Sequence, residues 1–204
     1  IPVTVDELIP LARAVVRGSH RALVVADLPF GSYEASAELA LATSVRFFKE
    51  SGVMAVKLEG AHIETVKKLV TSGIPVMGHL GLTPQSMHQL GGYKVQGRTD
   101  GDVIVEAAKA LQAAGAFAIV LELVPAELAA RITTELTIPT IGIGAGVNCD
   151  AQVLVWTDLM GITKKAPKLA KAYRNLRAEM LAATAEFAAD VRSGQFPTEA
   201  QTFN

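Results

Sequence analysis

The chain has 204 residues, of which 50% are hydrophobic and 19% are charged. This composition excludes disordered and fibrous proteins, and the length allows one domain with a sizeable core. Lysine and arginine number 19 against 20 aspartate and glutamate residues, which leaves a net charge of -1. Such a balance provides no basic surface for nucleic acid or an anionic membrane, so we expect a small-molecule partner.

Cysteine usage and hydropathy indicate a cytoplasmic protein without a membrane span. The single cysteine, Cys149, excludes an internal disulfide framework and is compatible with a reducing compartment. No apolar run reaches about 18 residues, the length of a membrane helix. The segment that starts at Ile1 has neither the basic leader nor the long apolar core of a signal peptide.

The first predicted element is a helix that begins after Thr4 and ends near Gly18. Thr4 and Glu7 have the spacing of a capping box, and apolar residues follow at helical spacing. The next segment, "RALVVADLPF", is almost wholly apolar. It is typical of a parallel strand that is covered on both faces.

The same alternation of helix and apolar strand recurs along the chain. We predict five further strands in "VMAVKLEG", "IPVMGHLG", "AFAIVLELVP", "IPTIGIGAG" and "AQVLVW", each preceded by a helical segment of about ten to fifteen residues. This order predicts right-handed parallel crossovers and an α/β fold. Barrel closure needs about eight β/α units and six are readable, so either the sheet is open or two units are missing from the N-terminus.

The C-terminal part of the chain reads as one long amphipathic helix over about 164–192. Its apolar positions near one face are Leu169, Tyr173, Leu176, Met180, Ala183 and Phe187. We expect this face to pack on the barrel or on a neighbouring subunit, within a single domain that spans 1–204. Trp156, at the end of an apolar strand, is expected to belong to the core.

Charged and polar residues cluster at the ends of the predicted strands, at Asp27, Lys57, Glu59, His79 and Glu122. Burying an unpaired ion among valines costs several kcal/mol, so these groups must pair, bind a metal or meet a charged ligand. The carboxyl ends of parallel strands form the active-site face of α/β proteins. We therefore expect these side chains to line a catalytic mouth.

Each of these residues also has a purely structural interpretation. Asp27 could cap the next helix, and Lys57 with Glu59 could form a structural ion pair, because side chains two residues apart share one strand face. His79 could be a core histidine with satisfied hydrogen bonds. Glu122, flanked by leucines, is the hardest to explain by structure alone.

The residue types indicate enolate chemistry. Asp27 and Glu59 are oxygen ligands suited to a hard cation such as magnesium, and the sequence has no Cys/His cluster for zinc. Lys57 could neutralise a substrate carboxylate. Glu122 suits a general base that abstracts a proton next to a metal-polarised carbonyl.

Several segments closely resemble the ketopantoate hydroxymethyltransferase family (3-methyl-2-oxobutanoate hydroxymethyltransferase). They are "VVADLPFGSY", "AVKLEG", "GIPVMGHLGLTPQS", "LGGYKVQGR", "AGAFAIVLELVPAELA", "IPTIGIGAGVNCDAQVLVW" and "SGQFP". The resemblance runs over essentially the whole chain. It implies a (β/α)8 TIM barrel of the phosphoenolpyruvate/pyruvate superfamily type, assembled as a homodecamer in several bacterial members.

The resemblance also implies an activity and a set of residue roles. Members transfer a hydroxymethyl group from 5,10-methylenetetrahydrofolate to 3-methyl-2-oxobutanoate through a magnesium-stabilised enolate, giving ketopantoate for pantothenate and coenzyme A synthesis. By the family pattern Asp27 and Glu59 are magnesium ligands, and Lys57 holds the ketoacid together with Asp27. His79 lines the substrate site, and Glu122 is the catalytic proton acceptor.

One expected part of the family pattern is absent from the sequence. Family members carry two further β/α units before the point that corresponds to Ile1, and the second of these strands ends in a Gly-Asp-Ser segment. Its aspartate is a third magnesium ligand. The count of six readable units agrees with a shortfall of two, so we expect that ligand upstream of Ile1.

Two other functions remain open at the level of the sequence. A magnesium-dependent lyase or aldolase acting on another 2-oxo acid would use the same apparatus to polarise and deprotonate its substrate. A non-catalytic ring subunit is the third possibility, although the retained charges at Asp27, Lys57, Glu59 and Glu122 argue against it. Dependence on folate separates the first two.

Overall fold

The computed structural model describes residues 1–203 and contains two compact units. The first unit, Ile1–Val153, contains the whole β-sheet and the helices around it. The second unit begins at Leu154 and contains two helices and a short 3-10 turn.

The first unit alternates helices with short strands, as predicted. Its elements are α1 (Val5–Gly18), β1 (Val25–Asp27), α2 (Ala37–Ser51), β2 (Ala55–Lys57), α3 (Ile63–Thr71), β3 (Val76–Gly81), η1 (Pro84–Ser86), α4 (Met87–Leu90), α5 (Gly101–Ala113), β4 (Ala118–Glu122), α6 (Ala126–Glu135), β5 (Thr140–Ile143) and β6 (Ala151–Gln152).

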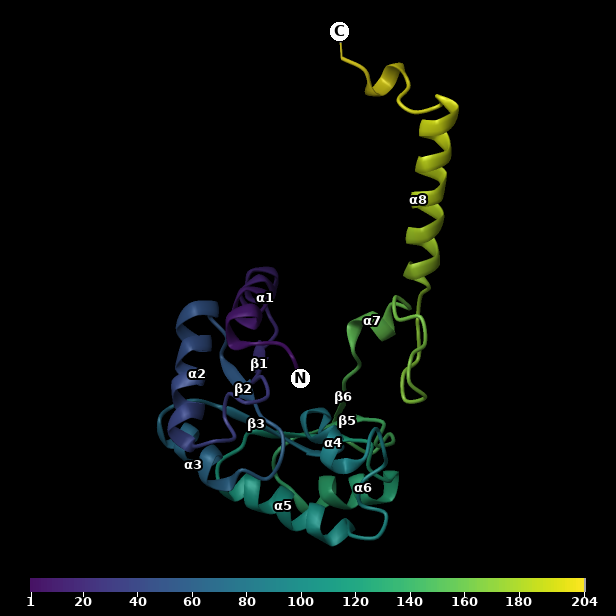
Figure 1. Ribbon diagram of the computed structural model, residues 1–204. Coiled ribbons are helices and arrows are strands. Elements are labelled where there is room, and N and C mark those ends of the chain that lie inside the picture. The colour runs from purple at the N-terminus through teal and green to yellow at the C-terminus, as the bar shows by residue number, and fades with distance from the viewer. Residues whose placement is uncertain (204) are drawn as a thin grey trace. The chain divides into compact units, whose positions relative to one another are not determined.

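The six strands form one parallel sheet in the order β1-β2-β3-β4-β5-β6. Each strand pairs with its successor in the sequence, which is the winding of a β/α barrel. Figure 1 shows α2, α3, α5 and α6 along one side of this sheet. The predicted α/β fold with a parallel sheet is therefore confirmed, and the part of the chain described here forms a half-barrel.

The start of α1 follows its predicted capping chemistry. The Thr4 side chain accepts a hydrogen bond from the backbone N–H of Glu7, and the Glu7 carboxylate accepts one from the backbone N–H of Thr4 at 2.8 Å. The helix ends at Gly18, as expected. It packs against α2, and Asp6 forms an exposed ion pair with Arg46 of that helix at 2.8 Å.

The connection between β5 and β6 differs from the prediction. A helix was expected before each strand, but residues 144–150 join these two strands without one. Seven residues are few for a crossover helix, and Gly144 and Gly146 both adopt positive φ angles that an α-helix does not use. The segment therefore turns tightly and returns to the same sheet.

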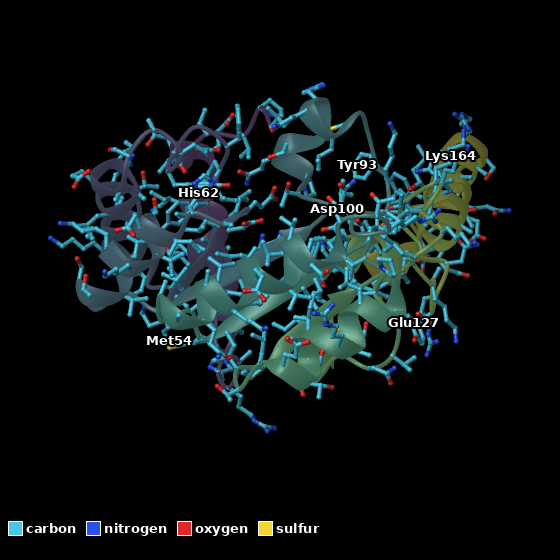
Figure 2. All side chains as sticks on the ribbon, turned by 90° about the horizontal axis from the view of Figure 1, so that it is seen from below. Met54, His62, Tyr93, Asp100, Glu127 and Lys164 are labelled. Atoms are coloured by element: carbon cyan, nitrogen blue, oxygen red, sulfur yellow. The ribbon has the colours of Figure 1, made fainter. Side chains whose placement is uncertain are left out.

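The core of the first unit lies between the sheet and its helices. Phe47 of α2, Leu111 of α5 and Ile119 of β4 are completely buried in one continuous cluster. Burial of each such side chain contributes about 1.5–3 kcal/mol to folding. Met54 and Tyr93, both labelled in Figure 2, are by contrast exposed.

The second unit differs from two predictions, which concern the start of its long helix and the burial of Trp156. It comprises α7 (Trp156–Leu159), α8 (Leu176–Ser193) and η2 (Glu199–Gln201), so the helix predicted over about 164–192 begins at Leu176. Asn175 caps α8 by accepting a hydrogen bond from the backbone N–H of Ala178. The residues before it return to α7, where the Tyr173 N–H donates to the Leu159 carbonyl at 2.8 Å.

Trp156 is not a core residue, contrary to the prediction. It begins α7 and is 62% exposed. The strand that precedes it, β6, ends four residues earlier at Gln152, so the apolar run "VLVW" continues beyond the sheet.

Among residues 1–203, no helix combines the length and the apolar character that crossing a membrane requires.

Candidate active site

The predicted site residues converge at the carboxyl edge of the sheet. Asp27, Lys57 and Glu122 are the last residues of β1, β2 and β4. Glu59 follows β2 by two residues, and His79 lies within β3. The register pairs Asp27 with Lys57 and thereby aligns the first two strand ends. Parallel pairing alone brings these side chains to one edge.

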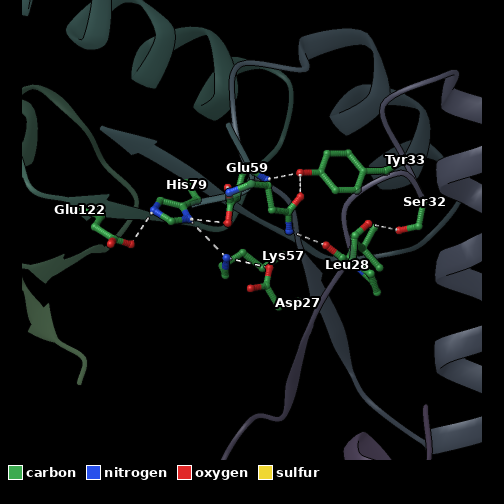
Figure 3. Close-up of polar contacts among 10 residues, drawn as sticks. Asp27, Leu28, Ser32, Tyr33, Lys57, Glu59, His79 and Glu122 are labelled. Carbon is green, nitrogen blue, oxygen red and sulfur yellow. Dashed lines mark hydrogen bonds and ion pairs between the residues drawn. The ribbon is translucent and has the colours of Figure 1, made fainter. Parts of the chain in front are cut away.

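The charged groups form a continuous line of contacts (Figure 3). The Lys57 ammonium lies 2.7 Å from a carboxylate oxygen of Asp27 and 3.3 Å from Nδ1 of His79. On the other side of the imidazole ring, Nε2 lies 3.3 Å from a carboxylate oxygen of Glu122. Glu59 also approaches Nδ1 of His79, at 3.9 Å. The structure thus brings all five predicted residues together.

The contacts of His79 determine where its ring proton lies. The Lys57 ammonium has donors and no acceptor, so Nδ1 accepts and the proton of a neutral ring is on Nε2. That proton faces Glu122, although the two atoms at 3.3 Å are not aligned as a hydrogen bond. His79 is only 3% exposed, so this nitrogen is buried without a hydrogen-bond partner among residues 1–203.

Glu59 is the most buried carboxylate of the site, at 5% exposure. Burial raises the pKa of Glu59, and the hydrogen bond from the backbone N–H of Gln85 partly offsets this. That bond reaches one carboxylate oxygen, Oε2, at 2.9 Å. The other oxygen, Oε1, lies 3.9 Å from Nδ1 of His79, which is too far for a hydrogen bond, and it accepts none from residues 1–203. Oε1 is therefore free to accept a ligand.

The donor set fits magnesium as an ion that keeps several waters. Asp27 has a half-exposed side chain, and one oxygen of Glu59 accepts no hydrogen bond within residues 1–203. Magnesium typically takes one or two carboxylates, with water and substrate oxygens completing an octahedron. Residues 1–203 contain no group of three or more His, Cys, Asp or Glu side chains placed to hold an ion by themselves.

The backbone conformation next to Glu122 is unusual. The next residue, Leu123, has a φ of 46°, the only non-glycine positive φ within residues 1–203. Its N–H donates to the Ile143 carbonyl and its carbonyl accepts from the Gln96 N–H, both at 2.9 Å. Gly81, with a φ of 92°, lies so close that a Cβ there would collide with the Glu122 carbonyl oxygen. The chain turns sharply at the point that positions this carboxylate.

Sequence reasoning did not single out Tyr33 and Gln85, which connect the same strand ends. Tyr33 is 1% exposed, and its hydroxyl lies 2.6 Å from the Gln85 side-chain oxygen. Tyr33 lies in a loop, within "DLPFGSY", and Gln85 lies in the three-residue 3-10 turn η1, within "LTPQS", and neither segment has helical or strand periodicity. A buried tyrosine in a loop that otherwise carries Gly, Pro and Ser is the one signal that could have identified them.

The fold and the site together define a class of proteins. A phosphoenolpyruvate phosphomutase from Streptomyces platensis subsp. rosaceus matches 95% of this chain and 69% of its own, with a TM-score of 0.55 at 16% identity. A phosphonopyruvate hydrolase in complex with oxalate and Mg++ matches all of this chain and 72% of its own, with a TM-score of 0.53 at 16% identity. This chain therefore shares its fold with these two proteins.

Sequence comparison identifies the family within that class. The model of the family described as ketopantoate hydroxymethyltransferase matches residues 1–199. The 3-methyl-2-oxobutanoate hydroxymethyltransferase of Frankia alni is 60% identical, over 97% of this chain and 67% of its own length. The enzyme of the same name from Saccharopolyspora erythraea is 59% identical, over all of this chain and 71% of its own length. The chain belongs to the ketopantoate hydroxymethyltransferase family.

Proposed function

We propose that this protein is an enzyme that transfers a hydroxymethyl group from 5,10-methylenetetrahydrofolate to 3-methyl-2-oxobutanoate, forming ketopantoate. Membership of the family supports the activity over a lyase acting on another 2-oxo acid. The observation that carries the proposal is the line of contacts from Asp27 through Lys57 and His79 to Glu122. The closeness of a lysine ammonium and a glutamate carboxylate supports a reaction that needs a cation for the substrate carboxylate and a nearby proton acceptor.

The residues take distinct roles in this reaction. Lys57, whose ammonium is already paired with Asp27 at 2.7 Å, binds the carboxylate of the ketoacid. Glu122 accepts the proton from C3, the only carbon of this ketoacid that bears a hydrogen next to the carbonyl. Water cleaves the methylene bridge of the folate, which releases tetrahydrofolate and leaves the one-carbon unit as a carbonyl. The C3 carbanion then bonds to that carbon, and its oxygen, which came from water, takes up a proton to become the new hydroxyl. His79 lines the substrate site between these groups.

The carboxylates of Asp27 and Glu59 would hold magnesium, joined by an aspartate outside these 204 residues. When bound, the metal polarises the carbonyl of the ketoacid and so acidifies the proton on C3. Glu59 contributes the uncommitted oxygen Oε1, while its other oxygen is fixed by the Gln85 N–H. Burial keeps water away from Glu59 and strengthens its interaction with a cation.

Deuterium exchange at C3 of 3-methyl-2-oxobutanoate tests the assignment of the base. In Glu122→Gln we expect the magnesium-dependent exchange rate to fall by about 100- to 10,000-fold, because the amide cannot accept the proton. Glu127→Gln makes the same chemical change at an exposed position of α6 and should exchange like the wild-type protein. Nuclear magnetic resonance of the ketoacid in heavy water follows the loss of the C3 proton.

Two outcomes would contradict the proposal. Exchange in Glu122→Gln at the rate of Glu127→Gln would remove Glu122 as the base. Formation of a C3-substituted product without methylenetetrahydrofolate would favour the lyase or aldolase, because only the transferase requires the folate as its carbon donor.

We propose further that the complete protein is a (β/α)8 barrel in which two β/α units precede the six described here. The consecutive strand order supports this, as does the chain's coverage of 67% of its Frankia alni relative. In that barrel, residues 1–204 belong to one domain. A cytoplasmic homo-oligomer, a decamer by family resemblance, completes the proposal.

A further inference from the structure

Gln85 connects three strand ends of the site at once. Its backbone N–H donates to Oε2 of Glu59, after β2, at 2.9 Å. Its side-chain nitrogen donates to the carbonyl of Leu28, the residue after Asp27, at 2.9 Å. Its side-chain oxygen lies 2.6 Å from the hydroxyl of Tyr33, in the loop after β1. Gln85 itself belongs to η1, which follows β3.

The direction of each hydrogen bond is determined by the chemistry of its partner. The Leu28 carbonyl can only accept, so the nitrogen of the Gln85 amide must face it and the oxygen must face Tyr33. The Tyr33 hydroxyl then donates to that oxygen and is free to accept from the Glu59 N–H, 3.2 Å away.

The resulting network holds the carboxylate of Glu59 and the backbone next to Asp27, the two residues that were assigned to magnesium. Tyr33 holds the backbone of Glu59, and Gln85 holds its carboxylate. Through Leu28, Gln85 also holds the backbone next to Asp27, and the Leu28 N–H donates to the Lys57 carbonyl at 2.9 Å. Figure 3 shows these bonds running from Glu59 and Tyr33 to Leu28. Neither Tyr33 nor Gln85 offers a charge of its own to the site.

We infer that Tyr33 and Gln85 are positioning residues that set the placement of Asp27 and Glu59 and thereby the affinity of the site for a divalent cation. The inference rests on the proposed function, since it takes those carboxylates as the magnesium ligands. Groups that orient metal ligands typically change metal affinity or activity by about 10- to 100-fold when they are removed.

Two single substitutions each remove side-chain hydrogen bonds of the network with little change in the shape of the side chain. Tyr33→Phe deletes the hydroxyl and leaves the Gln85 oxygen and the Glu59 N–H unpaired. Gln85→Met keeps the length of the side chain and, because the backbone N–H remains, keeps the bond to Glu59 Oε2. Ser32→Ala is the matched control, because it removes a buried hydrogen bond of the same loop, from Ser32 to the Pro29 carbonyl, that touches neither carboxylate.

Magnesium affinity, measured by titration calorimetry on the full-length protein, distinguishes positioning from general loop stability. We expect the dissociation constant to rise about 10-fold in Tyr33→Phe and in Gln85→Met, and to stay at the wild-type value in Ser32→Ala. Thermal unfolding without magnesium should shift to lower temperature in both Tyr33→Phe, which loses two hydrogen bonds, and Ser32→Ala, which loses one. Saturating magnesium should restore C3 exchange in the two network variants.

The double variant Tyr33→Phe with Gln85→Met adds an internal check. Because the two residues share a hydrogen bond, the rise in its dissociation constant should be smaller than the product of the two single effects. Magnesium affinities of both network variants equal to that of Ser32→Ala would overturn the inference. A wild-type protein that exchanges the C3 proton yet binds no magnesium would instead remove the metal from the proposed function, and the inference with it.

Discussion

The two edges of the parallel sheet use polar residues in opposite ways. At the carboxyl edge, His79 keeps a buried nitrogen without an aligned partner and Glu59 keeps one uncommitted oxygen. At the amino edge of β5, Thr140 and Asp150 satisfy one another: the Asp150 carboxylate accepts from the Thr140 N–H at 2.8 Å. Polar atoms without hydrogen-bond partners at the carboxyl edge can bind ligands, whereas the hydrogen-bonded pairs at the amino edge stabilise the fold.

At the amino edge, a small number of side chains form hydrogen bonds with backbone N–H groups. The Gln112 side-chain oxygen, at the end of α5, accepts from the N–H groups of Thr137 and Ile138 at 2.7 and 3.2 Å. The hydroxyl of Thr140, a completely buried residue, pairs with that of Thr133 at 2.7 Å. Substitutions at this edge should therefore affect stability and spare activity.

Gly81→Ala should give the largest effect and should affect both properties, because Gly81 lies against the backbone of Glu122. The new methyl group would collide with the Glu122 carbonyl oxygen, in a backbone conformation that disfavours side chains. We expect a loss of about 3 kcal/mol in the free energy of unfolding. Displacement of the base should also slow C3 exchange by about 100-fold.

Gly73→Ala is the matched control for this collision. Gly73 also has a positive φ, of 86°, but a Cβ there meets nothing within 4 Å. It should lose about 1–2 kcal/mol from the backbone conformation alone and retain the wild-type exchange rate. Urea unfolding and the exchange assay measure the two quantities. Equal exchange rates in the two alanine variants would show that Gly81 does not position Glu122.

Thr140→Val should cost less and should leave catalysis intact. Valine has the shape of threonine but removes the hydroxyl that pairs with the partly buried Thr133 hydroxyl and takes one donor from Asp150. We expect a loss of about 1–3 kcal/mol in the free energy of unfolding, measured in urea. Thr134→Val, at an exposed position of α6, should stay within about 0.5 kcal/mol of the wild type. A slower C3 exchange in Thr140→Val would contradict the expectation that residues at the amino edge affect stability alone.

The smallest expected effect is a pH dependence at Asp150. Hydrogen bonds from the Thr140 N–H and hydroxyl hold the pKa of Asp150 below its usual range. The folded state therefore favours the carboxylate, and this stabilisation is present above the unfolded pKa, near 3.9. It is lost as the pH falls through that value toward the lower folded pKa. Because the carboxylate is exposed, the effect is modest.

Unfolding in urea at several pH values measures this contribution. The difference in stability between the wild-type protein and Asp150→Asn should be constant from about pH 7 to pH 5 and should shrink below about pH 4. A difference that does not change between pH 5 and pH 3 would show that the carboxylate form is not preferred in the folded state.

Much of the site could be predicted from local sequence because a charged residue in an apolar strand is conspicuous. Asp27, Lys57, Glu59, His79 and Glu122 all interrupt valine- and leucine-rich runs, and parallel pairing brings such positions to one edge. The contacts among them show that the five side chains lie together. Their catalytic roles remain proposals.

The network of Tyr33 and Gln85 could not be predicted in this way. These residues are 52 positions apart and lie in a loop and a short 3-10 turn, so no periodic pattern connects them. The corrections have the same origin. Trp156 continues an apolar run but lies outside the sheet, and α8 begins at Leu176 because Asn175 caps it and the preceding residues return to α7.

The sequence by itself determined the alternation of helices and strands, the capping of α1 and the identity of the charged strand ends, because each depends on residues within one or two turns or one strand. Tertiary structure alone decided which polar atoms are satisfied and which are free. The uncommitted oxygen of Glu59, the unaligned nitrogen of His79 and the bonds of Gln85 depend on distances between segments far apart in the chain. Such distances are set when the strands pair and the helices pack.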